Sequence, residues 1–186
     1  MRAPFTDGTV FGDVVGAVQA NGTFTVDGVM KGAHQVVVDG LPSPWVVKSV
    51  VLRGSEITDR HLDVNVGERV RDIRVTISDE SSIVRGVVRT ADDQPAANTS
   101  VLVFSQVPLF WIRTNRRMRV ARTDADGRFT VEGLPAGEYV AIATASVDEG
   151  DLGRPDRLRE LQAKGVPFRL ASDGAQADVK LQVIFR

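Results

Sequence analysis

The stretch DADGRFTVEGLPAGEYVAIA, residues 124–143, carries the strongest local pattern in the chain. Asp-Gly before the alternating run RFTVE is typical of a hairpin turn, because Gly127 can take a positive φ without steric cost. A second turn follows, in which Pro135 fixes φ and Gly137 permits a left-handed residue. Tyr139 then opens another apolar run, where a buried tyrosine commonly ties its hydroxyl to nearby backbone. The stretch therefore predicts strands joined by tight turns.

An earlier segment repeats this pattern. ANGTFTVDGVMKGAHQVV (20–37) aligns without gaps with ADGRFTVEGLPAGEYVAI (125–142), and DIRVTI (72–77) matches DVKLQV (178–183) at nearly the same offset. Two matching blocks at a constant spacing indicate a duplicated domain, which we place at 1–79 and 80–186. The aligned turn and corner positions are Gly22, Gly28 and His34 in the first copy and Gly127, Gly133 and Tyr139 in the second.

The runs between the turns predict an all-β fold. Alternating apolar and polar residues recur about every eight to twelve positions, separated by Gly, Asp, Asn and Pro, which is typical of an antiparallel β-sandwich. One short helix is expected over about 155–164, because Pro155 suits a first helical turn and Gly165 a C-terminal stop. Leu158 and Leu161 form a narrow apolar stripe, so this helix should lie over one edge or end of the second sandwich.

The offset also predicts that the first domain is incomplete at its N-terminus. Counterparts of SIVRGVVRT and SVLVFSQ, the first two strands of the second copy, would fall before Met1. Such a sandwich exposes unpaired backbone and only partly covers its inward apolar residues, here Phe24, Val26, Val36 and Val38. We expect a strand from elsewhere to complete it: an upstream part of the parent protein, which is the favoured source, a neighbouring copy in a head-to-tail polymer, or FTDGTVFGDVV (5–15).

Composition excludes several classes of function. The chain has 186 residues, no cysteine and a formal net charge of −1. The absence of cysteine excludes disulfides, thiolate catalysis and cysteine-bound zinc. The near-neutral charge gives no general attraction to nucleic acid or membrane. The sequence contains no signal peptide pattern and no apolar run suited to a membrane span.

No catalytic or metal-binding motif stands out. Asp124 and Asp126 do not have the spacing of a calcium loop, and the first copy places an uncharged asparagine at the aligned position. The only histidines, His34 and His61, have neither zinc-ligand spacing nor a nucleophile turn nearby. Phosphate-binding glycine motifs are also missing. We therefore expect no enzymatic activity, no metal and no cofactor.

VPLFWIRTNRRMRVART (107–123) has an unusual basic and aromatic composition, and we call it the basic–aromatic segment. Its arginines and aromatics could hold an anionic sugar, a lipid headgroup or an acidic partner. The preferred alternative is structural: Met118 and Val120 point inward, Trp111 caps the sandwich, and the arginines point outward to pair with Asp148, Glu149 and Asp151. The candidate ligand- or partner-binding residues are Phe110, Trp111, Arg113, Arg116, Arg117 and Arg119.

These motifs resemble a known family. TDADGRFTVEGLPAGEYVAIA (123–143) is similar to the core of carboxypeptidase regulatory-like domains, which are transthyretin- or prealbumin-like, Ig-like β-sandwiches. VRGVVRTADDQPAANTSVLVF (84–104) resembles their opening, with Gln94 in place of the usual glycine before proline. The first copy departs further, since Met30, Lys31 and His34 replace Pro, Ala and Tyr. The likeness extends over 20–186, and the tandem copies resemble those of large secreted or envelope-linked bacterial proteins, notably acidobacterial ones.

The resemblance implies a function without supplying catalytic residues. It favours a non-catalytic structural and interaction module of a larger extracellular or cell-envelope protein, acting as a spacer, assembly or adhesion domain. Its partners would be other domains of the parent protein or neighbouring copies, joined by strand complementation. Two alternatives stay open: a polysaccharide-binding module that uses the basic–aromatic segment, and an accessory domain of an upstream enzyme.

Overall fold

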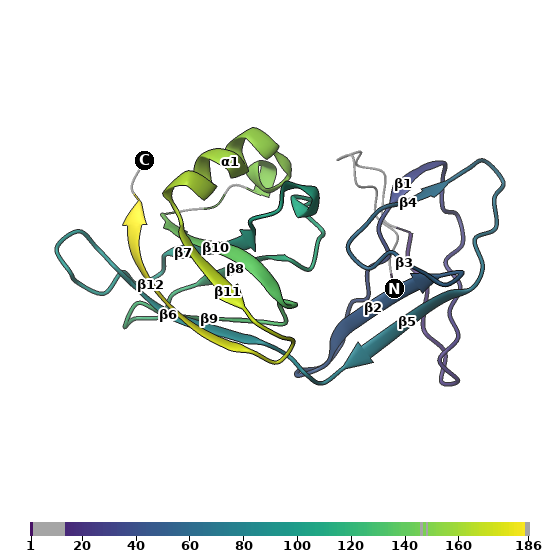
Figure 1. Cartoon of the computed structure of the whole chain (residues 1–186), viewed down its shortest axis with the longest axis horizontal. Coiled ribbons are helices and arrows are strands. Elements are labelled where there is room, and N and C mark those ends of the chain that lie inside the picture. The colour runs from purple at the N-terminus through teal and green to yellow at the C-terminus, as the bar shows by residue number, and fades with distance from the viewer. Residues whose placement is uncertain (2–13, 146, 148, 185–186) are drawn as a thin grey trace. The chain divides into compact units, whose positions relative to one another are not determined.

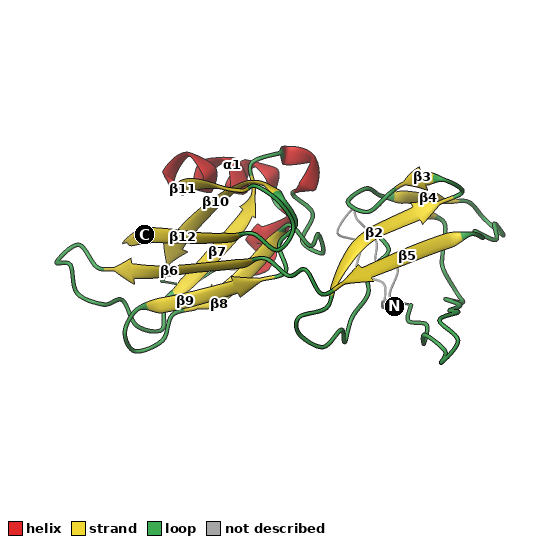
Figure 2. Cartoon of the chain, turned by 60° about the horizontal axis from the view of Figure 1, so that its bottom comes forward, coloured by secondary structure: helices red, strands yellow, loops and turns green. Residues whose placement is uncertain are grey.

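The computed structural model describes residue 1 and residues 14–184 apart from 146 and 148. The chain divides into two compact units, Met1–Asp79 and Glu80–Arg186 (Figure 1). Strands dominate both units, and α1 (Pro155–Lys164) is the one α-helix of the described residues (Figure 2). The predicted all-β class with one short helix is confirmed. None of the described helices combines the length and the hydropathy needed to cross a membrane.

The first unit contains two small antiparallel sheets. β2 (Val46–Leu52) is the centre of one sheet, between β3 (Ser55–Glu56) and β5 (Ile73–Ser78). In the other sheet, β1 (Gly32–His34) pairs with β4 (Leu62–Val64). The strands are short because glycines, prolines and Asp-rich turns interrupt the apolar runs every few residues.

Few apolar side chains are buried in the first unit. Among its described residues only Val50 and Val64 are buried aliphatic side chains, and the inward residues expected to be partly covered (Phe24, Val26, Val36 and Val38) are half-buried. Polar contacts supplement this core, for example the Val50 amide that donates to Thr58 Oγ1 at 2.9 Å. The predicted makeshift strand of residues 5–15 lies outside the described residues except for its last two positions.

The second unit is a sandwich of seven strands. They are β6 (Ile83–Arg89), β7 (Ser100–Ser105), β8 (Met118–Arg122), β9 (Arg128–Glu132), β10 (Gly137–Thr144), β11 (Val166–Leu170) and β12 (Gln176–Ile184). The sheet order is β8-β7-β10-β12-β6-β9, and β11 pairs with the first half of β10. One layer therefore holds β8, β7, β10 and β11, and the other holds β9, β6 and β12.

The expected antiparallel pairing holds for the second unit except at β12. β12 runs parallel to β6 along Gln176–Gln182 and parallel to β10 at Ala143 and Thr144. A hairpin forces antiparallel pairing, but β12 reaches both neighbours through long connections, and such connections permit parallel pairs. β12 thereby joins the two layers at one end of the sandwich.

Apolar side chains fill two layers of the second unit. The inner layer lies between the two sheets and includes Val84, Val103, Phe129 and Tyr139. The outer layer covers the other face of β7 and β10 with Trp111 and the helical leucines. β7 is consequently buried on both faces, which explains why SVLVFS reads as a continuous apolar run without alternation.

α1 has the predicted bounds but a different location. Leu158 and Leu161 pack on Leu102 and Ile142, so α1 covers a sheet face instead of an edge or end. The Lys164 ammonium lies 3.1 Å from a Glu160 carboxylate oxygen, a favourable ion pair one turn apart. Gly165 ends the helix with a φ of −86°, not a left-handed one. Glycine is needed there because an added Cβ would lie 2.2 Å from Val140 Cγ1.

A close approach of strands makes Gly86 a sensitive core position. A Cβ on Gly86 would lie 2.2 Å from the Val179 carbonyl oxygen and 2.5 Å from the Phe129 ring. The strand backbone cannot yield as a flexible side chain does, so Gly86→Ala should lower the free energy of unfolding by about 1–3 kcal/mol. Urea denaturation followed by circular dichroism measures this loss.

Gly153→Ala is the matched control for this prediction. A Cβ on Gly153 meets no atom within 4 Å and its φ is not positive, so the same substitution should change stability by less than about 0.5 kcal/mol. Equal stability of Gly86→Ala and wild type would show that Phe129 moves aside without cost.

Candidate functional site

The basic–aromatic segment forms the connection between β7 and β8. It contains the short 3₁₀-helix η1 (Pro108–Phe110), a turn through Asn115, and then β8. Arg113 is exposed, Phe110 and Arg116 are half-buried, and Trp111 is buried. The six candidate residues therefore lie on one loop and one edge strand, but they differ in whether a ligand could reach them.

Trp111 belongs to the core and not to an open surface. Its side chain is 4% exposed, and its Nε1 donates a 2.7 Å hydrogen bond to the Ser105 carbonyl oxygen. The ring meets Phe104 edge to face, with centroids 6.0 Å apart. An indole that binds sugar must expose at least one ring face, and Trp111 exposes neither, so it builds the outer apolar layer instead.

Arg117 ties the segment to the turn that precedes β10. Its Nη1 donates to the Ala136 carbonyl oxygen at 2.9 Å and to the Tyr139 hydroxyl at 3.3 Å. The guanidinium carbon lies 4.7 Å from the centre of the Phe110 ring, within the range of a cation–π contact. Two of the candidate residues, Phe110 and Arg117, therefore stabilise a corner of the sandwich.

The predicted orientation of β8 was partly wrong. Met118 is buried as expected, but Val120 is 47% exposed. Arg119 pairs with Val103 and so shares the inner face of the sandwich, where it is half-buried. Burial lowers the pKa of its guanidinium below the ordinary value. Alternation predicted Val120 inside, but Val120 pairs with Leu102 on the outer face of the edge strand β8, where Met118 is covered and Val120 is not.

The side chains expected to pair with these arginines, Asp148, Glu149 and Asp151, lie outside the described residues. Arg113, Arg116 and Arg117 all have polar or aromatic interactions within the protein. The segment therefore does not present a row of free guanidinium groups.

The acids of the 124–127 turn serve the backbone. Asp124 Oδ1 accepts hydrogen bonds from the amides of Asp126 and Arg128, at 2.9 and 2.8 Å. Gly127 has a φ of 74°, the left-handed conformation that a tight hairpin turn requires. Across the described part of the chain, no three His, Asp or Glu side chains cluster in a way that could hold a metal ion.

Corresponding turns in the two units have the same backbone geometry. Gly22, Gly28 and Gly32 have φ values of 82°, 79° and 147°, and Gly127, Gly133 and Gly137 have 74°, 74° and 155°. The Tyr139 hydroxyl donates to the Pro135 carbonyl oxygen at 2.7 Å, four residues back. The buried His34 ring makes the same connection to the Met30 carbonyl oxygen, at 2.8 Å. His61, in contrast, is exposed and lies 3.7 Å from Asp63.

A groove in the second unit is lined by residues of β6, β10, β11 and β12 and by the end of α1. Its volume is about 750 Å³, within the usual range of ligand sites. Three cationic side chains reach it from separate elements: Arg89 at the end of β6, Lys164 at the end of α1, and Lys180 on β12. No sequence pattern indicates this grouping, because the three residues lie far apart in the chain and each looks like an ordinary surface charge.

Comparison with known proteins identifies part of the second unit. Residues 83–147 match the family model of the carboxypeptidase regulatory-like domain. The recognition made from the sequence is confirmed for these residues, which run from β6 through β10 and include Tyr139. No curated protein matches the chain.

Solved structures resemble the chain only distantly. The Bacillus cereus major pilin subunit BcpA is 17% identical over 54% of this chain and 28% of its own, with a TM-score of 0.32. A Pseudomonas aeruginosa protein with a proposed carbohydrate-binding role is 17% identical over 55% of this chain and 88% of its own, with a TM-score of 0.34. Catechol 1,2-dioxygenase from an Acinetobacter species is 12% identical over 55% of this chain and 52% of its own, with a TM-score of 0.32. Similarities of this size assign no function.

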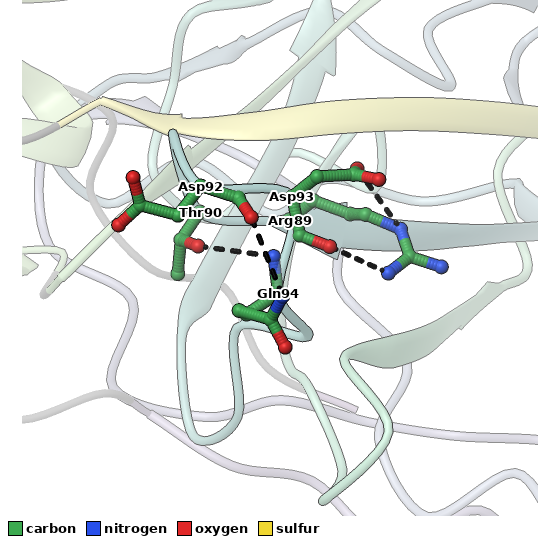
Figure 3. Close-up of polar contacts among 5 residues, drawn as sticks. All are labelled: Arg89, Thr90, Asp92, Asp93 and Gln94. Carbon is green, nitrogen blue, oxygen red and sulfur yellow. Dashed lines mark hydrogen bonds and ion pairs between the residues drawn. The ribbon is translucent and has the colours of Figure 1, made fainter.

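The matched segment departs from the usual family sequence at Gln94, in the turn after β6. Figure 3 shows the polar contacts of this turn. Asp93, not Gln94, takes the positive φ, at 59°. Gln94 closes the turn, since its backbone amide donates to Thr90 Oγ1 at 3.2 Å and its Nε2 to the Asp92 carbonyl oxygen at 3.4 Å. Arg89 Nη1 donates to the Asp93 carbonyl oxygen at 2.9 Å, which holds this guanidinium at the rim of the groove.

Proposed function

We propose that the chain is a non-catalytic structural and interaction module of a larger protein, acting as a spacer and assembly domain in the cell envelope or outside the cell. The observation that carries this proposal is the internal use of the basic–aromatic segment. Trp111 donates a hydrogen bond to the Ser105 carbonyl oxygen, and Arg117 donates one to the Ala136 carbonyl oxygen. The indole and guanidinium groups that could have bound a ligand therefore stabilise the sandwich. The regulatory-like domain supports the same role by resemblance.

We further propose that the two units are copies of one sandwich domain. Their matching glycine φ values and the two ring-to-carbonyl bonds of His34 and Tyr139 support a common origin. Independent sequences rarely converge on three positive-φ glycines at equal spacing followed by the same corner bond. A tandem of related sandwiches suits a spacer, because each repeat adds length without a new fold.

The contact with partners would be strand addition at β5. β5 pairs with β2 on one side, and no described strand pairs with its other side. Sheet edges are often protected by inward charges, prolines or bulges. β8, an edge of the second unit, has the inward Arg119, whereas β5 contains no proline and exposes 44% of Ile77. An extended segment of another copy or of the parent protein could therefore extend the β5 sheet.

Sedimentation velocity over a wide concentration range tests this role. Wild-type protein should self-associate, and Ile77→Lys should raise the concentration at the midpoint of association by about tenfold or more, because a charge on the edge opposes pairing. Val120→Lys is the matched control: Val120 is similarly exposed, at 47%, but lies on the protected edge β8, so association should not change. A wild-type chain that stays monomeric throughout would contradict self-association through β5.

A further inference from the structure

We infer that the groove between β6, β12 and the end of α1 binds an acidic, extended peptide segment of a partner protein. This inference rests on the proposed interaction role and names the chemistry of one partner. The site lies within the second unit and is separate from both the basic–aromatic segment and the β5 edge.

Charge is the first argument. Arg89, Lys164 and Lys180 line the groove, and Asp93 is the single acid among its lining residues. The Arg89 Nε lies 3.6 Å from Asp93 Oδ1, and Lys164 is paired with Glu160, all at exposed positions where ion pairs are weak and easily exchanged. The Lys180 ammonium has no ion pair or hydrogen bond to any described residue. The groove thus offers cations that an incoming carboxylate can engage.

The position of the cations is the second argument. Lys164 is the last residue of α1, and it is followed directly by Gly165 and β11, so the helix end fixes the place where this side chain starts. Lys180 and Gln182 alternate along the exposed face of β12, next to Val87 and Arg89 of β6 in register. Lys180 and Arg89 are therefore offset by two residues along the strand direction, which matches the spacing of alternate carboxylates on an extended chain.

The apolar lining residues of the groove favour a peptide over a sugar as the ligand. Val87, Val166 and Ile184 contribute aliphatic surface to the groove, and none of its lining residues is aromatic. Sugar sites usually present an aromatic platform, and the lining residues of this groove supply none. A peptide that alternates glutamate with an aliphatic residue places carboxylates on the cations and apolar side chains on the walls, so the observations favour a protein segment.

Fluorescence anisotropy with two labelled hexapeptides tests the inference in the full chain. Wild-type protein should bind Glu-Val-Glu-Val-Glu-Val at least about tenfold more tightly than Gln-Val-Gln-Val-Gln-Val, and added salt should reduce the difference. The double variant Lys164→Glu, Lys180→Glu should lose this preference. Asp93→Asn should tighten binding several-fold, because it removes the one acid of the groove while asparagine tolerates the positive φ of this position.

Lys31→Glu is the matched control, since it makes the same change at an exposed lysine of the first unit. It should leave both affinities unchanged. Equal affinity of the wild type for the two peptides would overturn the inference. Equal losses of affinity for the glutamate peptide in Lys31→Glu and in the Lys164→Glu, Lys180→Glu variant would also overturn it. Binding of polygalacturonate, but not of peptide, that depends on Lys164 and Lys180 would overturn the peptide assignment. A wild-type chain that binds neither peptide but still self-associates would reject the groove and leave the β5 proposal intact.

Discussion

Trp111→Ala should lower the free energy of unfolding by about 3–5 kcal/mol, the usual cost of deleting a buried tryptophan. The side chain is 4% exposed, fills the outer layer beside Phe104, and donates its indole hydrogen to the Ser105 carbonyl oxygen. Removal leaves a cavity under α1 and an unpaired buried carbonyl. Urea denaturation followed by far-ultraviolet circular dichroism measures the loss, with attention to separate transitions of the two units.

Two further variants separate the structural role of Trp111 from a role in binding. Trp45→Ala removes a tryptophan that is 42% exposed, and it should change stability by less than about 0.5 kcal/mol. Trp111→Phe keeps a ring against Phe104 but loses the hydrogen bond, so it should cost about 1–3 kcal/mol. If Trp111→Ala left stability unchanged and abolished retention on an anionic polysaccharide column, the segment would be a glycan site and the structural interpretation would fail.

Gly127→Ala should lower the free energy of unfolding by about 2–4 kcal/mol, the sum of two effects. Gly127 has a φ of 74°, where alanine is strained by about 1 kcal/mol relative to glycine. An added Cβ would also lie 2.5 Å from the Val88 carbonyl oxygen and 3.0 Å from the Ala96 amide nitrogen, so the backbone must move at a further cost of about 1–3 kcal/mol. Thermal or urea denaturation measures the total.

Gly174→Ala isolates the first of these two effects. Gly174 has the same φ of 74°, but its Cβ would meet only Glu80 Cβ, at an ordinary 3.8 Å. This variant should therefore lose only about 1 kcal/mol. Equal losses in the two variants would mean that the close approach of β6 to the turn has no energetic consequence, and that backbone conformation alone requires glycine at position 127.

Local patterns were sufficient for the turns, the helix and the strand class. Asp-Gly, Gly-Leu-Pro-Ala-Gly and Pro155 act through φ and hydrogen bonds within a few residues, so they predict the turns and the start of the helix without the rest of the chain. The observed φ of Gly133 follows from such a local cause. Gly165 at the helix end is required instead by the distant Val140. The regulatory-like motif likewise consists largely of turn residues, and residues 83–147 match that family model.

Placement relative to a neighbour could not be read from the sequence. Alternation predicted Val120 on the inner face of β8 and Arg119 on the outer face. In the structure Arg119 pairs with Val103, which belongs to the inner layer, so Arg119 lies on the inner face. The leucines of α1 showed that the helix has an apolar stripe, but not that the free face of β7 and β10 is what it covers. Both outcomes depend on which strand lies at the edge, and that is a property of the whole sheet.

The sequence by itself determined an all-β chain with one short helix, the turn geometry at its glycines, and the family of residues 83–147. Those features arise from interactions between residues close together in the chain. Only the tertiary structure decided that β12 runs parallel to β6, that Trp111 is buried, and that Arg89, Lys164 and Lys180 share one groove. These features join residues far apart in sequence, because packing of whole strands and layers sets which distant side chains become neighbours.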